Sequence, residues 1–162
     1  MRTLCVFLFV CLWSCSTGQE LLGPIELKDL KKAPHNEWFD TEYTNYNPFA
    51  KTLDQIQPLL KDVEIEVFMG TWCGDSQLQV PAFFRILDEL EFKEKTTLIA
   101  VDEDKKTPSG SAAAKGITNV PTFIFYKNGT EIHRIVESPI DFLEDDMLAI
   151  LSGAAYKHTY ED

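Results

Sequence analysis

The chain has 162 residues, enough for one compact domain, and its 44% hydrophobic and 25% charged residues are typical of a globular protein. Its formal net charge of −11 would repel the phosphates of nucleic acids, and no basic run is present to bind anionic lipids. We therefore expect no nucleic-acid partner and no direct binding to a lipid surface.

The first 18 residues have the pattern of an export signal. Arg2 precedes an apolar run from Leu4 to Trp13, and small residues follow as far as Gly18. The run is too short to span a membrane, because a membrane-spanning helix needs about 20 apolar residues. Residues 1–18 are therefore expected to be a signal peptide.

Two cleavage sites fit this signal. Leu12-Trp13-Ser14-Cys15 resembles the lipobox of bacterial lipoproteins, in which the cysteine is lipidated and becomes the first residue of the mature protein. The alternative is ordinary cleavage after Gly18. The protein is then periplasmic, or it is anchored in a bacterial cell envelope through a lipid on Cys15, which is the only membrane attachment that we expect.

The four cysteines have different fates under this interpretation. Cys5 and Cys11 leave with the signal, and Cys15 is either lipidated or removed. Cys73 is then the one thiol of the mature domain. Exported proteins usually pair their cysteines, so a single unpaired thiol is a candidate reactive group.

The mature chain is expected to begin with a tether. Residues 19–34 are polar, although Ile25, Leu27 and Leu30 could form a first strand or a short turn, and the folded domain is expected over residues 35–162. Apolar residues at helical spacing predict a helix over residues 49–61, bent at Pro58.

The middle of the chain predicts two strands joined by a helix. Residues 63–69 begin with alternating charged and apolar residues, which is typical of a strand, and residues 97–101 form an apolar strand. A turn over residues 70–74 leads into a helix that begins at Asp75 and contains Pro81. The buried face of this helix is predicted to comprise Leu78, Phe83, Ile86, Leu87 and Leu90.

The last third predicts a short helix, a hairpin and a closing helix. Residues 112–116 form a helical stub that ends at a glycine, and Asn128-Gly129 between two apolar runs is a strong hairpin signal. An amphipathic pattern predicts a helix over residues 141–151. The order of elements implies a mixed sheet with helices on both sides.

These motifs together resemble the thioredoxin fold, an α/β fold in which helices flank a central mixed sheet within a single domain. The resemblance rests on the run from Phe68 to Gly74, on Pro81 inside the following helix, on Val120-Pro121-Thr122 and on the Asn128-Gly129 hairpin. It covers residues 63–151. The turn is most similar to that of exported bacterial thioredoxin-like proteins whose sequence reads Trp-Cys-Gly-Asp-Ser.

The resemblance assigns roles to particular residues. It implies that Cys73 is the attacking cysteine and that Trp72 is the flanking tryptophan. It also implies that Pro121 is a cis-proline, which leaves the backbone of Val120 free to pair with a substrate strand. Gly74 and Asp75 complete the turn that a substrate would contact.

Three positions depart from the family pattern. Ser76 replaces the second, resolving cysteine, and Asp75 replaces a proline or similar residue of the turn. Val67 stands where many thioredoxins keep a buried carboxylate. The loss of this carboxylate agrees with the loss of the resolving thiol, since no second proton remains to be moved.

One cysteine can form a mixed disulfide but cannot resolve it internally. The helix N-terminus would stabilise a Cys73 thiolate, Ser76 could donate a hydrogen bond to the sulfur, and the Asp75 carboxylate would repel it. We expect a single-thiol oxidoreductase or isomerase without cofactor, whose partners are protein or small-molecule thiols and disulfides of the cell envelope.

The same residues are compatible with two other functions. The first is a redox-inactive module that binds peptides or proteins in the groove at Val120 and Pro121. The second is a metal or iron–sulfur site, which is disfavoured because His35, His133 and His158 show no ligand spacing with Cys73. No metal is therefore expected.

Overall fold

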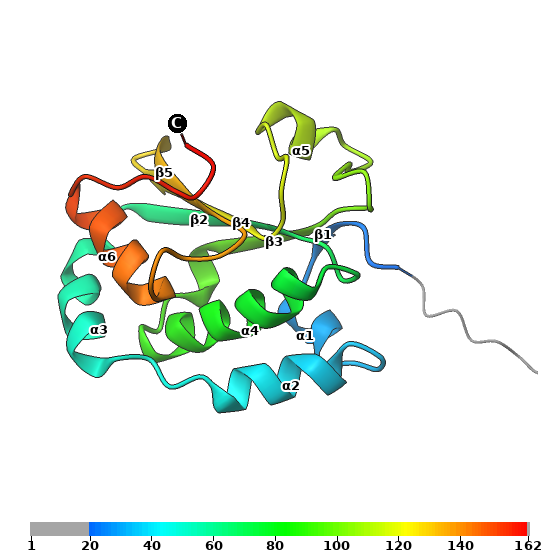
Figure 1. Cartoon of the computed structure of the whole chain (residues 1–162), viewed down its shortest axis with the longest axis horizontal. Helices are drawn as coiled ribbons and strands as arrows, with labels where there is room; N and C mark the ends of the chain where they lie inside the picture. Colours follow the sequence, from blue (N-terminus) through cyan, green and yellow to red (C-terminus); the bar gives the residue numbers. More distant parts are fainter. Residues whose placement is uncertain (1–19, 162) are drawn as a thin grey trace, which may run out of the picture.

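A five-stranded mixed sheet forms the centre of the fold (Figure 1). The structure is a computed structural model that describes residues 20–161. The strand order is β1-β3-β2-β4-β5, in which β2 and β3 are parallel and the other three pairs are antiparallel. The strands are β1 (Gly23–Ile25), β2 (Val63–Met69), β3 (Thr96–Ala100), β4 (Thr122–Lys127) and β5 (Thr130–Val136).

The helices lie unequally on the two faces of the sheet. In Figure 1 α5 (Ser111–Ala114) lies above the sheet, and the other labelled helices lie below it. The described α-helices are α1 (Leu27–Leu30), α2 (Asn36–Asn45), α3 (Ala50–Ile56), α4 (Gly74–Glu89), α5 (Ser111–Ala114) and α6 (Leu143–Ser152). None of the helices within residues 20–161 has the length and apolar character needed to cross a membrane.

The alternation along β2 explains which face carries the main core. Val63, Ile65, Val67 and Met69 point toward the helical layer and are fully or almost fully buried. They meet aromatic side chains of α4 and β4 there, of which Phe83 and Phe123 lie with ring centroids 4.4 Å apart. Burial of this apolar face is the main stabilising term of the fold.

The predicted mixed sheet with flanking helices is confirmed, but the face that carries α5 is partly open. α5 and the adjoining loops cover a small second core that includes Phe68 and Ile124. Beyond this core the face is polar. The Lys115 ammonium lies 3.2 Å from the Glu66 carboxylate, and the Tyr126 hydroxyl donates to the same carboxylate at 2.6 Å.

Much of residues 19–34 forms a strand and a short helix rather than a tether, which agrees with the alternative that Ile25, Leu27 and Leu30 belong to a first strand or a short turn. β1 pairs antiparallel with β3, so that Gly23 lies opposite Ala100 and Ile25 lies opposite Leu98. Leu30 of α1 is fully buried in the main core. The physical reason is that the outer edge of β3 offers unpaired backbone groups, which this polar segment satisfies.

One side chain of α4 also differs from its prediction. Leu78 was placed on the buried face, but its side chain is 49% exposed. It belongs to an outward ridge of α4 that also includes Gly74 and Asp75, whereas Ser76, Val80 and Phe83 point inward. The helical period of 3.6 residues separates these two faces.

Candidate functional site

A tight turn at the end of β2 places Cys73 at the start of α4. The Cys73 N–H donates to the Gly70 carbonyl at 3.1 Å, and the Cys73 carbonyl accepts the Gln77 N–H at 2.9 Å. Cys73 is the N-cap residue of α4, with φ −86° and ψ 124°, and it is partly buried. Cys73 therefore lies at a helix N-terminus, where the aligned peptide dipoles favour negative charge.

The start of β4 packs directly against this thiol. The Cys73 Sγ–H donates to the Val120 carbonyl, with Sγ and the oxygen 3.1 Å apart. The Val120–Pro121 peptide bond is cis, and both residues are buried. The fold thus brings together residues 47 positions apart. The Val120 carbonyl therefore already accepts one hydrogen bond, from the Cys73 thiol.

Ser76 has a different partner from the one expected. The Gly70 N–H donates to the Ser76 hydroxyl oxygen at 3.2 Å, and the Ser76 side chain is fully buried. The third residue of the helix points inward beneath the turn. Ser76 therefore ties the first residue of the turn to the first turn of α4, and so fixes the position of the helix N-terminus under Cys73.

Trp72 closes the turn on the β3 side. Its indole Nε1–H donates to the Val101 carbonyl at 3.1 Å, and the Lys105 ammonium lies 5.4 Å from the ring centroid. The indole also lies directly over Gly70, because a Cβ added there would be 2.5 Å from Trp72 Cε2. Only glycine leaves room for this arrangement.

The C-terminal segment reaches the same region, which the sequence analysis did not predict. The Tyr160 hydroxyl donates to the Glu137 carboxylate, and the Asn119 side-chain amide donates to its other oxygen at 2.9 Å. The hydrogen bond to Glu137 raises the pKa of Tyr160, and the charge of Asp75 adds to this effect. Asn119 directly precedes Val120, so these residues form one border of the site.

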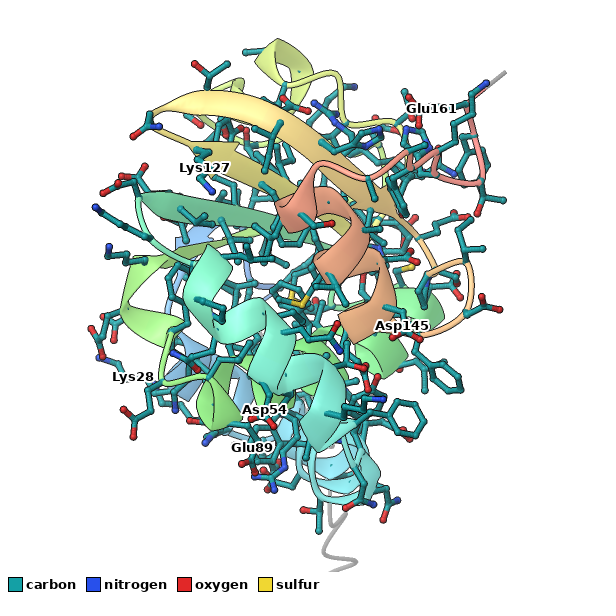
Figure 2. The ribbon with its side chains drawn as sticks, turned by 90° about the vertical axis from the view of Figure 1, so that its left-hand side faces the viewer. Lys28, Asp54, Glu89, Lys127, Asp145 and Glu161 are labelled. Carbon is teal, nitrogen blue, oxygen red and sulfur yellow. The ribbon has the colours of Figure 1, made fainter. Side chains whose placement is uncertain are left out.

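His158 helps to hold this C-terminal segment, and we predict a pH-dependent contribution from it. Its Nδ1 accepts the Tyr160 N–H at 3.2 Å, which requires that nitrogen to be unprotonated. Burial lowers the pKa of His158, and the nearby His133 and Arg134 lower it further against the opposing effect of Glu161. Figure 2 shows Glu161 close to the end of the chain.

The direction of this pH dependence follows from the lowered pKa of His158. The neutral ring is favoured in the folded state, so its contribution is present above the ordinary value of about 6.5 and is lost as pH falls below it. We expect the free energy of unfolding to fall more between pH 7.5 and 5.5 in the wild type than in His158→Asn, whose side-chain oxygen can still accept the Tyr160 N–H. Urea unfolding at both pH values measures this, and parallel losses would contradict it.

No metal site is apparent in the described part of the chain. Residues 20–161 contain no group of three or more His, Cys, Asp or Glu side chains placed to hold a metal ion. His133 and His158 lie with ring centroids 6.2 Å apart and share the Glu161 carboxylate. The Nδ1 atoms of both rings already accept backbone N–H groups.

A mixed sheet of this order, flanked by helices and with Cys73 at the N-cap of its central helix, defines a thioredoxin-fold protein. The family model for thioredoxin matches residues 41–148. The chain belongs to the thioredoxin family.

Known relatives agree with this assignment. The thioredoxin of Rickettsia prowazekii is 36% identical over 64 residues, which are 40% of this chain and 57% of that protein. The thioredoxin of Mycoplasma genitalium is 33% identical over 86 residues, 53% of this chain and 78% of that protein. The match to the Rickettsia prowazekii and Rickettsia typhi proteins thus spans little more than half of their length.

A solved structure shares the fold. A Pseudomonas aeruginosa protein of unknown function is similar with a TM-score of 0.52 at 16% identity, over 74% of this chain and 82% of that chain. At this identity the likeness concerns the fold alone. Membership of the thioredoxin family is consistent with thiol–disulfide redox chemistry.

Proposed function

We propose that this chain is an exported thioredoxin-family protein that exchanges thiols and disulfides through Cys73 alone. The observation that carries the proposal is the position of the thiol at the N-cap of α4, against Val120 and Pro121, with serine at the position of a resolving cysteine. Cys73 is the only cysteine in residues 20–161. The protein therefore acts without an internal disulfide.

The exchange proceeds in two steps. The Cys73 thiolate attacks one sulfur of a substrate disulfide, the sulfur–sulfur bond breaks, and the released substrate thiolate takes a proton from water. A mixed disulfide between Cys73 and the substrate remains. An external thiolate, or a second thiolate of the substrate, then attacks this mixed disulfide and returns Cys73 as a thiolate. Over both steps Cys73 is neither oxidised nor reduced.

The neighbouring residues have separate roles in this proposal. Gly74 and Asp75 are exposed beside the thiol and contact the substrate, and the Asp75 carboxylate repels the thiolate. Ser76 positions the helix N-terminus through Gly70, and Trp72 covers the turn. Val120 and Pro121 present the backbone against which a substrate segment lies.

The test uses the full chain with Cys5→Ser, Cys11→Ser and Cys15→Ser, called here the single-thiol chain, because Cys73 is then its only thiol. It is incubated with a disulfide-bonded protein at pH 7, quenched with alkylating agent and examined for mixed disulfides by mass. We expect an adduct that a small thiol releases, and none with added Cys73→Ser. If Cys73 forms no adduct with any disulfide, exchange is excluded, and the alternative is a redox-inactive module that binds peptides or proteins.

The proposal also includes export to a bacterial cell envelope, with lipidation at Cys15 or cleavage after Gly18. Residues 1–18, and with them the signal peptide and Cys15, lie outside the described residues, so the support is the sequence pattern of Arg2, the apolar run and the small residues after it. The intact mass of the protein recovered from producing cells tests this. A chain that still begins at Met1 would contradict export.

A further inference from the structure

A groove of about 280 Å³ lies beside the Cys73 turn, between α4, the β5–α6 loop and the end of α2. Leu78, Ala82, Pro139 and Phe142 supply its apolar lining, and Glu42 and Asp141 lie at its rim. None of these residues was predicted to belong to a functional site. The exchange at Cys73 does not by itself require them.

Both walls of the groove continue from the Cys73 site. On one side, the outward ridge of α4 runs from Gly74 and Asp75 at the active turn to Leu78 in the groove. On the other side, the Glu137 N–H donates to the Pro121 carbonyl at 2.7 Å, and the chain then passes directly into the β5–α6 loop. The two walls of the groove are therefore continuous in sequence with the two segments that contain Cys73 and Pro121.

The apolar side chains around the groove are held in exposed positions. Phe49, Leu78, Ile140 and Phe142 are each between 47% and 54% exposed, and the rings of Phe49 and Phe142 pack edge to face with centroids 5.0 Å apart. Large apolar side chains gathered at one place on the surface mark a binding site. A scattered exposed leucine would carry no such meaning.

Two buried carboxylates of α6 fix the loops that present these side chains. Glu144 accepts the Phe49 N–H at 2.9 Å, and Asp146 accepts the Ile140 N–H at 3.0 Å. Glu144 is 1% exposed and Asp146 is 4% exposed. The loops on both sides of the aromatic pair are thus tied to one helix, so the exposed surface is a fixed feature of the fold.

The charged side chains that line the groove are acidic. The lining residues include two acids and no lysine or arginine. Asp75 and Glu137 extend the same sign toward Cys73, and the whole chain has a formal net charge of −11. Such a rim attracts a cationic partner and repels an anionic one.

We infer that this groove binds the segment of a protein disulfide substrate that adjoins its reacting cysteine, and that it selects an apolar side chain flanked by lysine or arginine. The inference rests on the proposed exchange at Cys73. Leu78 is five residues after Cys73, about 7.5 Å along a helix. An extended substrate covers that distance in about two or three residues, which places the selected side chain two or three positions from its cysteine.

Activated cysteine peptides test this selection on the single-thiol chain. Each peptide carries thionitrobenzoate on its cysteine, so that attack by Cys73 on the peptide sulfur forms the Cys73–peptide disulfide and releases coloured thionitrobenzoate with the electron pair. The first peptide has leucine three positions from cysteine with lysine on either side of the leucine. The second has serine for leucine, and the third has glutamate for both lysines. Mercaptoethanol activated in the same way is the small, neutral reference.

We expect the first peptide to react about tenfold faster than either of the others, relative to the small reference. Leu78→Ser and Phe142→Ser should each lower the rate of the first peptide relative to the second about fivefold, which is the effect of losing one apolar contact. Glu42→Gln combined with Asp141→Asn should lower the preference for lysine over glutamate. Ile132→Ser is the matched control, because Ile132 is 37% exposed on β5 and lies outside the groove; it should preserve all the ratios.

The outcomes separate this inference from the proposed function. Equal relative rates for the three peptides, with the small reference still reacting, would overturn the groove inference and leave exchange at Cys73 intact. A failure of Cys73 to react with any activated thiol, the small reference included, would overturn the proposed function and the inference together.

Discussion

Replacing Ser76 with cysteine is expected to give a site that forms and breaks its own disulfide. Cys73 is the N-cap of α4 and position 76 is the third residue of the helix. With a helix radius of about 2.3 Å and a rise of about 1.5 Å per residue, Cα atoms three residues apart lie about 5 Å apart. A disulfide needs Cα atoms about 4.4–6.8 Å apart, so this spacing can be bridged.

The expected gain is in turnover. With dithiothreitol as reductant, the wild type should turn over only as fast as dithiothreitol itself releases the mixed disulfide. In the single-thiol chain with added Ser76→Cys, the second thiolate attacks the mixed disulfide from within the molecule. Because an intramolecular step of this kind has a high effective concentration, we expect insulin reduction to become about tenfold faster or more.

Two variants control for the loss of the serine itself. The Ser76 hydroxyl accepts the Gly70 N–H, so its replacement costs about 1 kcal/mol of stability in Ser76→Ala and in Ser76→Cys alike. Ser76→Ala should therefore be as destabilised as Ser76→Cys but show no gain in turnover. Cys73→Ser combined with Ser76→Cys should also be inactive, since the buried thiol at position 76 cannot attack first. If Ser76→Cys shows no internal disulfide under oxidised glutathione, the two positions are not aligned for exchange.

Short-range patterns explain why most of the sheet was predictable. β2 was expected over residues 63–69 and has those bounds, because its alternating residues have one face in the core. The Asn128-Gly129 hairpin was also predicted, and both residues have the positive φ values, 52° and 76°, that such a turn requires. The turn at Cys73 was predicted for a similar reason, since an apolar strand, a glycine-rich turn and a helix follow one another within a few residues.

Long-range contacts explain what the sequence analysis missed. The C-terminal segment borders the site because Tyr160 reaches Glu137 across 23 positions of the chain. β1 forms because the edge of β3 accepts it, although residues 19–34 contain little apolar periodicity. Neither partner is visible in a local pattern. The local signals were the apolar residues Ile25, Leu27 and Leu30 in residues 19–34, and the tyrosines of the C-terminal segment.

The acidic residues at the start of α6 show most clearly that a local sequence pattern does not reveal a long-range partner. Glu144, Asp145 and Asp146 look like one solvated run that favours a helix N-terminus. The structure exposes Asp145, which Figure 2 shows at the start of α6, and buries the other two. Glu144 is buried because its partners come from the connection between α2 and α3, where the Tyr46 hydroxyl and the Phe49 N–H both donate to it.

The second large effect is expected from Glu144→Ala. Removal of this carboxylate leaves the Tyr46 hydroxyl and the Phe49 N–H without their acceptor in a buried setting. Burial raises the pKa of Tyr46, with the hydrogen bond to Glu144 adding to the shift, so the phenol stays a donor at neutral pH. A hydrogen bond to a charged group contributes about 1.5–3 kcal/mol, so the two together should cost about 3 kcal/mol or more. Urea unfolding at pH 7 measures the loss.

Two further variants, one at Glu144 itself and one at the next residue, make this measurement specific. Glu144→Gln keeps an oxygen that can accept one of the two donors, so it should lose about half as much stability. Asp145→Asn changes an exposed carboxylate in the same helical turn and should stay within about 0.5 kcal/mol of the wild type. Equal unfolding midpoints for Glu144→Ala and Asp145→Asn would show that the buried hydrogen bonds contribute nothing. The expected ranking instead ties the stability of the fold to the loop that carries Phe49, and so to the apolar surface beside Cys73.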